Sequence, residues 1–251
     1  MTGARVSAIV ICQDEESQIG DCLASLAWCD EIVVVDSGSR DGTLDIARKH
    51  ATRLLHRDWT GIADQKNFAL AEASGDWVLN VDADERCTPP LREAARAAIA
   101  AGPALAGFEV RRRACYLGRW IEHGGWYPDW KLRLFRRGRA RFTAHGPHDR
   151  VRVDGAVARL DADLLHFSYA DFAEHVRTLE RYAEVVAAEW AAGGRRFSLV
   201  RALLHPPAKF LEGYVWKQGF RDGWPGFAIA YTSAFYVFAK HVKLWEKTRP
   251  R

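Results

Sequence analysis

Two aspartates, Asp82 and Asp84, stand one residue apart directly after the apolar run at residues 77–81. The run is short and rich in branched and aromatic residues, which predicts a buried strand. A strand that ends in two carboxylates delivers them to the carboxyl edge of an open α/β sheet, where such sheets bind ligands. Carboxylate oxygens at this spacing suit a hard cation such as Mg²⁺ or Mn²⁺, which in turn binds a diphosphate. Because Asp is also common in turns, the pair by itself does not separate a metal site from an exposed turn.

The elements that would position these aspartates alternate between strand and helix signals. Strands are expected at residues 6–12, 31–36, 52–56 and 77–81, and helices at 15–27, 42–50, 61–73 and from Pro89-Pro90 to about residue 102. This β-α-β-α pattern predicts an α/β fold with a mostly parallel sheet and helices on both faces.

Composition and missing motifs exclude several classes of protein. At 251 residues, with 48% hydrophobic and 27% charged residues, the chain is expected to form one soluble domain or one domain with an appendage. Residues 13–16 contain no glycine, which counts against NAD, FAD and sugar-1-phosphate nucleotidyltransferase sites. The five cysteines form no Cys-x-x-Cys pair, so we expect no zinc site, no disulfide framework and a reducing cytosol. The start of the chain does not resemble a signal peptide.

The second half of the chain is different in kind. Strands are expected at residues 108–113 and 131–137, the latter alternating Leu132 and Leu134 with Arg133, and an amphipathic helix at 171–192 ends at Gly193-Gly194. The last 47 residues hold 11 of the 29 aromatic residues, and residues 223–239 carry no charge. This segment is shorter than the roughly 20 residues of a membrane span. It fits either an interfacial membrane helix or a core-packing helix with an aromatic loop.

Positive charge is concentrated in two places. Residues 111–159 hold thirteen Lys and Arg against four Asp and Glu, and residues 205–251 hold eight against three, although the whole chain carries only +4. A solvated basic face and an anionic, extended partner, such as membrane headgroups or a phosphorylated glycan, both fit this pattern. No nucleic-acid-binding motif accompanies the charge, so no nucleic-acid partner is expected.

The first hundred residues resemble the inverting, GT-A-fold glycosyltransferases of family 2, in particular the bacterial lipopolysaccharide inner-core β-glucosyltransferase group. The matching segments are VICQDEE at 10–16, VVVDSGSRDGT at 33–43, QKN at 65–67 and ASGDWVLNVDADE at 73–85. Looser matches follow at WKLRLFRR (130–137), GPHD (146–149) and GFRDG (219–223).

The resemblance implies a role for individual residues of the donor site. Glu15 would help to hold the nucleotide, and Asp36 would accept the uracil imide proton or, in a purely structural role, cap the end of its strand. Lys66 would neutralise the donor phosphates or face the ribose, unless it is a solvated surface charge. Asp82 would meet the ribose and form part of the metal site, in which Asp84 would ligate the metal.

The resemblance also implies a catalytic carboxylate on the acceptor side, after the Asp-x-Asp pair. Asp149 is the first candidate for this base, with Asp where related sequences more often have Glu, and Asp129 is the second. His148 would orient the base or complete the metal's ligand set. Either aspartate could instead be a structural partner of the neighbouring arginines.

As a whole, the resemblance implies a GT-A domain at residues 1–165 and a helical, aromatic-rich extension at 166–251. The expected activity is metal-dependent, inverting transfer of a hexose, glucose first, from a UDP-sugar to a heptose of a lipopolysaccharide core. A lipid-linked acceptor and the two basic segments imply contact with an anionic membrane surface, and a cytoplasmic, peripheral location on the inner face of the bacterial inner membrane.

Two alternatives remain open at the level of sequence. One is a family 2 transferase that acts on another cell-surface glycan. The other is a non-catalytic protein that binds nucleotide sugars on a GT-A scaffold, against which the intact Asp36, Asp82 and Asp84 count.

Overall fold

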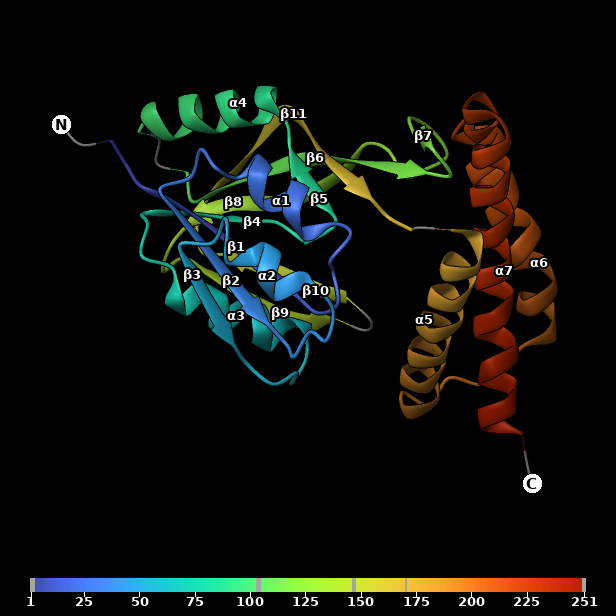
Figure 1. Cartoon of the computed structure of the whole chain (residues 1–251). Helices are drawn as coiled ribbons and strands as arrows, with labels where there is room; N and C mark the ends of the chain where they lie inside the picture. The colour runs from blue at the N-terminus through green and yellow to red at the C-terminus, as the bar shows by residue number, and fades with distance from the viewer. Residues whose placement is uncertain (1–2, 103–104, 146–147, 170, 250–251) are drawn as a thin grey trace. The chain divides into compact units, whose positions relative to one another are not determined.

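The computed structural model describes residues 3–102, 105–145, 148–169 and 171–249 (Figure 1). The chain forms two compact units. The first, called here the sheet unit, comprises Met1–Arg112 and Trp130–His166, and the second, the helical unit, comprises Arg113–Asp129 and Phe167–Arg251. The functional division expected between residues 165 and 166 stays a prediction.

A mixed sheet is the framework of the sheet unit. In the described chain its strand order is β3-β2-β1-β4-β8-β6-β11-β5, with β7 paired to β6. Neighbours among β3, β2, β1 and β4 are parallel, whereas β4 with β8 and β5 with β11 are antiparallel. The bounds are β1 (Val6–Cys12), β2 (Glu31–Asp36), β3 (Arg53–His56), β4 (Trp77–Asn80), β5 (Glu85–Cys87), β6 (Gly107–Tyr116), β7 (Arg119–Trp120), β8 (Asp129–Arg136) and β11 (Val157–Phe167).

Both faces of the parallel strands are covered, as the apolar runs predict. One core contains Val6, Ala8 and Val10 of β1 together with residues of α1 (Ile19–Ser25) and α4 (Pro89–Ala100). The opposite core contains Ile9 with residues of α3 (Ile62–Glu72) and of the hairpin β9 (Ala140–His145) and β10 (His148–Val153). Alternate side chains of one strand therefore enter different cores, which requires a continuous apolar run.

Most expected elements of this half are present, and the differences concern helix starts. The strands expected at 6–12 and 31–36 are confirmed to the residue. The helix expected at 15–27 is shorter, since α1 begins only at Ile19, and α2 covers only Thr43–Ala47. The backbone N–H of Glu15 and of Glu16 donate to Thr43 and Asp41, so the residues before α1 form a loop fastened to the next one.

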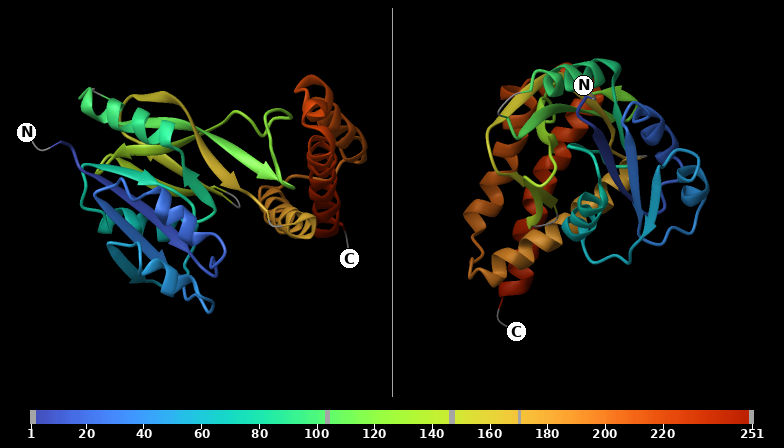
Figure 2. Two further views of the ribbon diagram at one scale, coloured as in Figure 1. Left: turned by 45° about the horizontal axis from the view of Figure 1, so that its top comes forward. Right: turned by 90° about the vertical axis from the view of Figure 1, so that its left-hand side faces the viewer.

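The helical unit is built around its last helix. In chain order it contains α5 (Phe172–Ala192), α6 (Leu199–Leu211), the π-helical turn η1 (Glu212–Trp216), the 3₁₀ turn η2 (Gly219–Asp222) and α7 (Gly223–Thr248). Figure 1 shows α7 between α5 and α6, and α7 packs against both (Figures 1 and 2). Ala228 and Ile229 of α7 are buried, so one side of the helix packs in the core of the unit, whereas Trp224, Tyr231 and Phe235 are exposed. Both interpretations of residues 223–239 therefore stay predictions. Pro225 does not interrupt the helix because it lies in the first turn.

No helix in the described part of the chain is long and apolar enough to cross a membrane.

Glu31 fastens three strands at the start of the parallel sheet. It is buried, and its carboxylate accepts hydrogen bonds from the Ser7 hydroxyl and from the backbone N–H and hydroxyl of Ser74. Burial opposes the charge, but the hydrogen bonds from Ser7 and Ser74 outweigh it and lower the pKa of Glu31. The stabilisation is therefore present above the ordinary pKa of 4.5 and is lost as the pH falls through the lower, folded-state value.

We expect Glu31→Gln to lower the free energy of unfolding at neutral pH by about 1–3 kcal/mol, because hydrogen bonds to a charged acceptor are lost. The difference between variant and parent should be smaller at a pH of about 3, below the ordinary pKa of 4.5, because the carboxylate of the unfolded parent is then protonated. Urea unfolding at both pH values measures this. Glu93→Gln, at an exposed carboxylate, is the control, and an equal loss of stability at both pH values would contradict the assignment.

Candidate active site

The strand order places the expected ligand-binding edge at β1. After β1, the chain adds β2 and β3 on one side of β1 and then β4 on its other side. The direction in which strands are added therefore reverses between β1 and β4. Asp36 pairs with Cys12 at the carboxyl end of β1, and Asn80, two residues before Asp82, pairs with Ile9. Asp36 thus ends β2 and Asp82 closely follows β4, the two strands that flank β1.

Asp82 lies between two cations. The Lys66 Nζ is 2.7 Å from its Oδ1, and an Arg133 guanidinium nitrogen is 2.7 Å from its Oδ2. Burial alone would raise the pKa of Asp82, but the charges of Arg133 and Lys66 outweigh it and hold the pKa well below its usual range. Asp82 is therefore an ionised hydrogen-bond acceptor at neutral pH. Lys66 is only 2% exposed, so its interpretation as a solvated surface charge is wrong.

Glu85 completes this ion cluster, and the sequence analysis gave it no role. It has no exposed surface; its carboxylate accepts a hydrogen bond from the Asp82 backbone N–H at 3.0 Å and pairs with Arg133. Burial raises the pKa of Glu85, against the opposing charge of Arg133. Arg133 comes from β8, beside β4, so one guanidinium fixes both carboxylates that begin and end the turn at residues 82–85.

Asp84 points to a different partner, His166. The Asp84 Oδ2 and the His166 Nε2 are 3.1 Å apart, and His166 pairs with Glu85 through the β11–β5 ladder. A carboxylate oxygen and an imidazole nitrogen fit Mn²⁺ or Mg²⁺ as a partial ligand set, because such ions commonly take one or two protein ligands and fill the rest with phosphate oxygens and water. No cluster of three or more His, Cys, Asp or Glu suited to a metal occurs among the described residues. His166 was missed by the sequence analysis; its only signal is a histidine near the end of an apolar run.

The consecutive residues Gln65, Lys66 and Asn67 each fasten a different element. The Gln65 side-chain amide donates to the Ser37 hydroxyl at 3.1 Å, and the Asn67 side chain exchanges two hydrogen bonds of 2.9 Å with the backbone of Phe142 in β9. Helix α3 is thereby fixed on both sides, which determines where the Lys66 ammonium lies.

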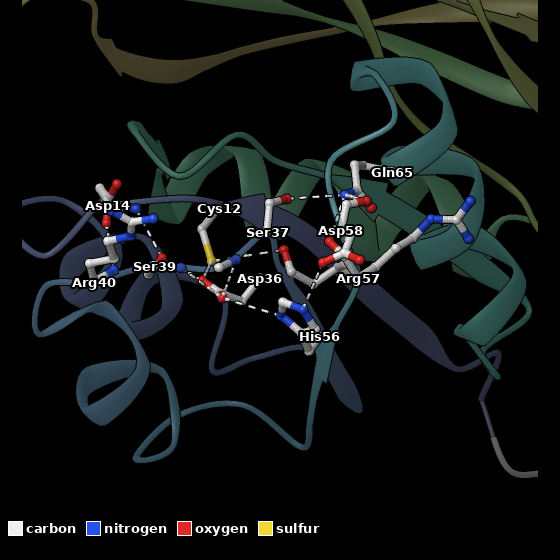
Figure 3. Close-up of polar contacts among 12 residues, drawn as sticks. Cys12, Asp14, Asp36, Ser37, Ser39, Arg40, His56, Arg57, Asp58 and Gln65 are labelled. Carbon is white, nitrogen blue, oxygen red and sulfur yellow. Dashed lines mark hydrogen bonds and ion pairs between the residues drawn. The ribbon is translucent and has the colours of Figure 1, made fainter.

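Asp36 organises its own loop (Figure 3). Its carboxylate accepts hydrogen bonds from the backbone N–H of Gly38 at 2.8 Å and of Ser39 at 3.0 Å, and from the Ser39 hydroxyl. The Asp14 carboxylate accepts the backbone N–H of Arg40 at 2.7 Å, so the loops after β1 and β2 are joined. Asp36 therefore serves as a structural acceptor at the end of its strand, and its expected contact with uracil stays a prediction.

The structure brings Lys66, Asp82 and Asp84 together in the sheet unit, with Glu15 in the loop after β1 and Asp36 at the end of β2. Their expected roles stay predictions.

The two candidate bases are placed differently. Asp129 is the first residue of β8 and belongs to the helical unit. Asp149 has its backbone in β10, opposite Ala144 of β9, but the side chains of His148 and Asp149 lie outside the described residues. Their roles as base also stay predictions.

Comparison with known proteins identifies the family. The family model "Glycosyl transferase family 2" matches residues 7–156. This chain belongs to glycosyl transferase family 2. The glycosyltransferase is 33% identical, over 96% of its length and 92% of the relative's, to the lipopolysaccharide core biosynthesis glycosyltransferase LpsC of Rhizobium meliloti. It is 26% identical to an uncharacterized glycosyltransferase, RT0209, of Rickettsia typhi, covering 96% and 87% of the two chains.

Solved structures confirm the expected GT-A architecture. The mannosyltransferase PcManGT of Pyrobaculum calidifontis, solved with GDP-Man and Mn²⁺, superposes with a TM-score of 0.58 at 18% identity, covering 99% of this chain and 89% of that one. Glucosyl-3-phosphoglycerate synthase of Mycobacterium tuberculosis, solved with Mn²⁺, UDP and phosphoglyceric acid, gives a TM-score of 0.53 at 16% identity, covering 78% and 81%. The expectations of an α/β fold, of an enzyme and of the family are therefore confirmed.

We expect Arg133→Met to destabilise this glycosyltransferase by about 3–5 kcal/mol, because it removes the cation that pairs with the fully buried carboxylate of Glu85 and with the neighbouring Asp82. Urea unfolding monitored by circular dichroism measures the loss. Arg139→Met, at an arginine whose side chain is 57% exposed, is the matched control and should change stability by less than about 0.5 kcal/mol. Equal stability of the two variants would show that Arg133 does not hold the cluster together.

Proposed function

We propose that this glycosyltransferase moves a hexose, glucose, from a UDP-sugar to a heptose of a lipopolysaccharide core, with inversion at the anomeric carbon. The observation that carries the proposal is the match to LpsC over nearly the full length of both chains, because it includes the acceptor-side half as well as the donor site. The two solved relatives that contain a nucleotide or nucleotide sugar together with Mn²⁺ support a nucleotide-sugar donor and a divalent cation.

Asp84 and His166 would hold the cation, Mg²⁺ or Mn²⁺. When bound, the cation supplies positive charge to the diphosphate that is released as the sugar bond breaks. The chain itself would orient the donor: Asp82, kept ionised by Lys66 and Arg133, accepts hydrogen bonds from the ribose. Lys66 stands beside it, close enough to contribute charge to the phosphates. Glu15 and Asp36 would hold the nucleotide from the loops after β1 and β2.

Inversion requires a single in-line attack by the acceptor hydroxyl on the face of the sugar opposite the diphosphate. A carboxylate must take the hydroxyl proton during that attack. Asp149 is proposed as this base and Asp129 as the second candidate.

The acceptor is lipid-linked, so the enzyme would work at an anionic membrane surface, bound peripherally to the inner face of the inner membrane. The excess of Lys and Arg over residues 111–159 and 205–251 supports this, because basic segments near a bilayer are attracted to anionic headgroups.

The donor and the metal can be tested together by UDP release from the purified protein, across a panel of UDP-sugars and one ADP-heptose. We expect release with one UDP-sugar, abolished by EDTA and restored by Mn²⁺ or Mg²⁺. Asp84→Asn should lower turnover by about 100-fold or more, and His166→Gln should raise the metal concentration for half-maximal rate by about 10–100-fold. Asp161→Asn, at a side chain that is 87% exposed, is the control. Parental activity of Asp84→Asn would refute the metal assignment, and UDP binding without sugar release would favour the non-catalytic alternative.

The base can be tested with a heptose-terminated lipopolysaccharide core as acceptor. We expect Asp149→Asn to lower the transfer rate by about 10²–10⁴-fold without changing the KM for the donor, because the base acts only on the acceptor hydroxyl. Asp154→Asn, five residues after it in the exposed turn, is the control. If Asp129→Asn lowered the transfer rate by this factor while Asp149→Asn stayed active, Asp129 and not Asp149 would be the base.

A further inference from the structure

The exposed side of α6 is apolar. Leu199, Val200, Leu203 and Leu204 are each at least 60% exposed, and Leu211 at the end of the helix is 45% exposed. Their spacing of three, four and seven residues places them on one side of the helix, whereas Ala202 is buried on the other. A surface helix of a soluble domain normally shows the reverse pattern, so this side of α6 is suited to an apolar environment outside the unit.

Exposed apolar side chains also occur in the segment that follows α6. Val215, Trp216 and Phe220 in and after η1 are exposed, and Trp224 at the start of α7 is 72% exposed. These rings are not loose: Trp224 stacks on Phe227 with ring centroids 5.4 Å apart. We define the α6 face as the nine exposed apolar residues Leu199, Val200, Leu203, Leu204, Leu211, Val215, Trp216, Phe220 and Trp224.

The charges around the α6 face are mainly positive. Residues 195–222 include six Lys and Arg against two acidic residues, Glu212 and Asp222. Glu212 is already paired with Lys209 at 2.9 Å and Lys217 at 2.6 Å, and Asp222 is buried. The cations Arg196, Arg201 and Arg221 are exposed. The surroundings of the α6 face are therefore complementary to an anionic surface.

We infer that the α6 face docks on the surface of an anionic lipid bilayer. With 13 residues α6 is about 20 Å long, shorter than the roughly 30 Å hydrocarbon core, so it would lie along the surface rather than across it. Leucine side chains would enter the boundary of the acyl chains, tryptophans would occupy the headgroup level, and the arginines would meet lipid phosphates. This inference rests on the proposed function for its purpose, because it names the surface that would hold the enzyme near a lipid-linked acceptor.

Charge favours a bilayer over a second copy of the chain. A symmetric dimer through the α6 face would join the same patch of both copies, so Arg196, Arg201 and Arg221 of both would surround one contact to which the patch brings no free acidic partner. An anionic membrane supplies the opposite charge at every position. The interfacial helix expected within residues 223–239 stays a prediction: one side of α7 packs inside the unit, but Trp224, Tyr231 and Phe235 are exposed on it. The α6 face is a further exposed apolar surface, which was not expected from the sequence.

The inference is tested by sedimentation of the full chain with vesicles of phosphatidylcholine alone or mixed with phosphatidylglycerol. We expect binding only to the mixed vesicles at low salt. Leu204→Asp should weaken binding by about tenfold or more. The leucine side chain that would enter the bilayer is replaced by a negative charge, which the anionic lipid repels. The double variant Arg196→Gln/Arg201→Gln should weaken it by about 5-fold for each cation removed. Val157→Asp, at a valine of the sheet unit that is 41% exposed, should bind as the parent does.

Each outcome of this experiment has one meaning. Leu204 is exposed, so unchanged thermal unfolding of Leu204→Asp is expected and separates lost docking from lost folding. Absence of parental binding to mixed vesicles, or equal binding by Leu204→Asp, would overturn the inference. It would also be overturned if sedimentation equilibrium showed a parental dimer that Leu204→Asp dissociates. Metal-dependent UDP release without vesicle binding would refute the docking inference and leave the proposed function intact. Vesicle binding without any sugar release would refute the proposed function and leave the docking inference intact.

Discussion

The turn at residues 82–85 depends on a single constraint: the Glu85 carboxylate is fully enclosed beside the partly exposed carboxylate of Asp82, so a cation must be enclosed with them. Arg133 meets this requirement from β8 and contacts both Asp82 and Glu85. Lys66 adds a second cation from α3. The backbone of the turn then has little freedom, which determines the direction of Asp84 toward His166. Removing a charge from one side of such a cluster is costly, because the remaining charges stay buried.

This constraint relates the donor site to the antiparallel half of the sheet. Asp82 and Asp84 follow a strand of the parallel half, but Arg133 and His166 come from β8 and β11, whose ladders with β4 and β5 are antiparallel. The parallel half supplies the loops that would receive a nucleotide, and the later strands supply the groups that orient the carboxylates. The GT-A site of this chain is thus assembled from segments more than 80 residues apart.

The parts that could be predicted from sequence are those in which neighbours along the chain decide the structure. Strands β1 and β2 are short runs of branched residues bounded by polar ones, and their bounds were predicted without error. Helix α6 was not predicted, because Pro206 and Pro207 resemble a helix end. The role of Glu85 depends on Arg133, 48 residues away in sequence, and buried Lys66 pairs with Asp82 of another element, so no local pattern could show either.

The position of α7 determines how the helical unit is completed during synthesis. Both α5 and α6 pack against α7, which follows them in the chain. While the ribosome is still making α7, the inner sides of α5 and α6 have no partner, although every strand of the sheet unit has already emerged. The sheet unit can therefore fold first, and the two earlier helices must wait for the third before they have a core to join.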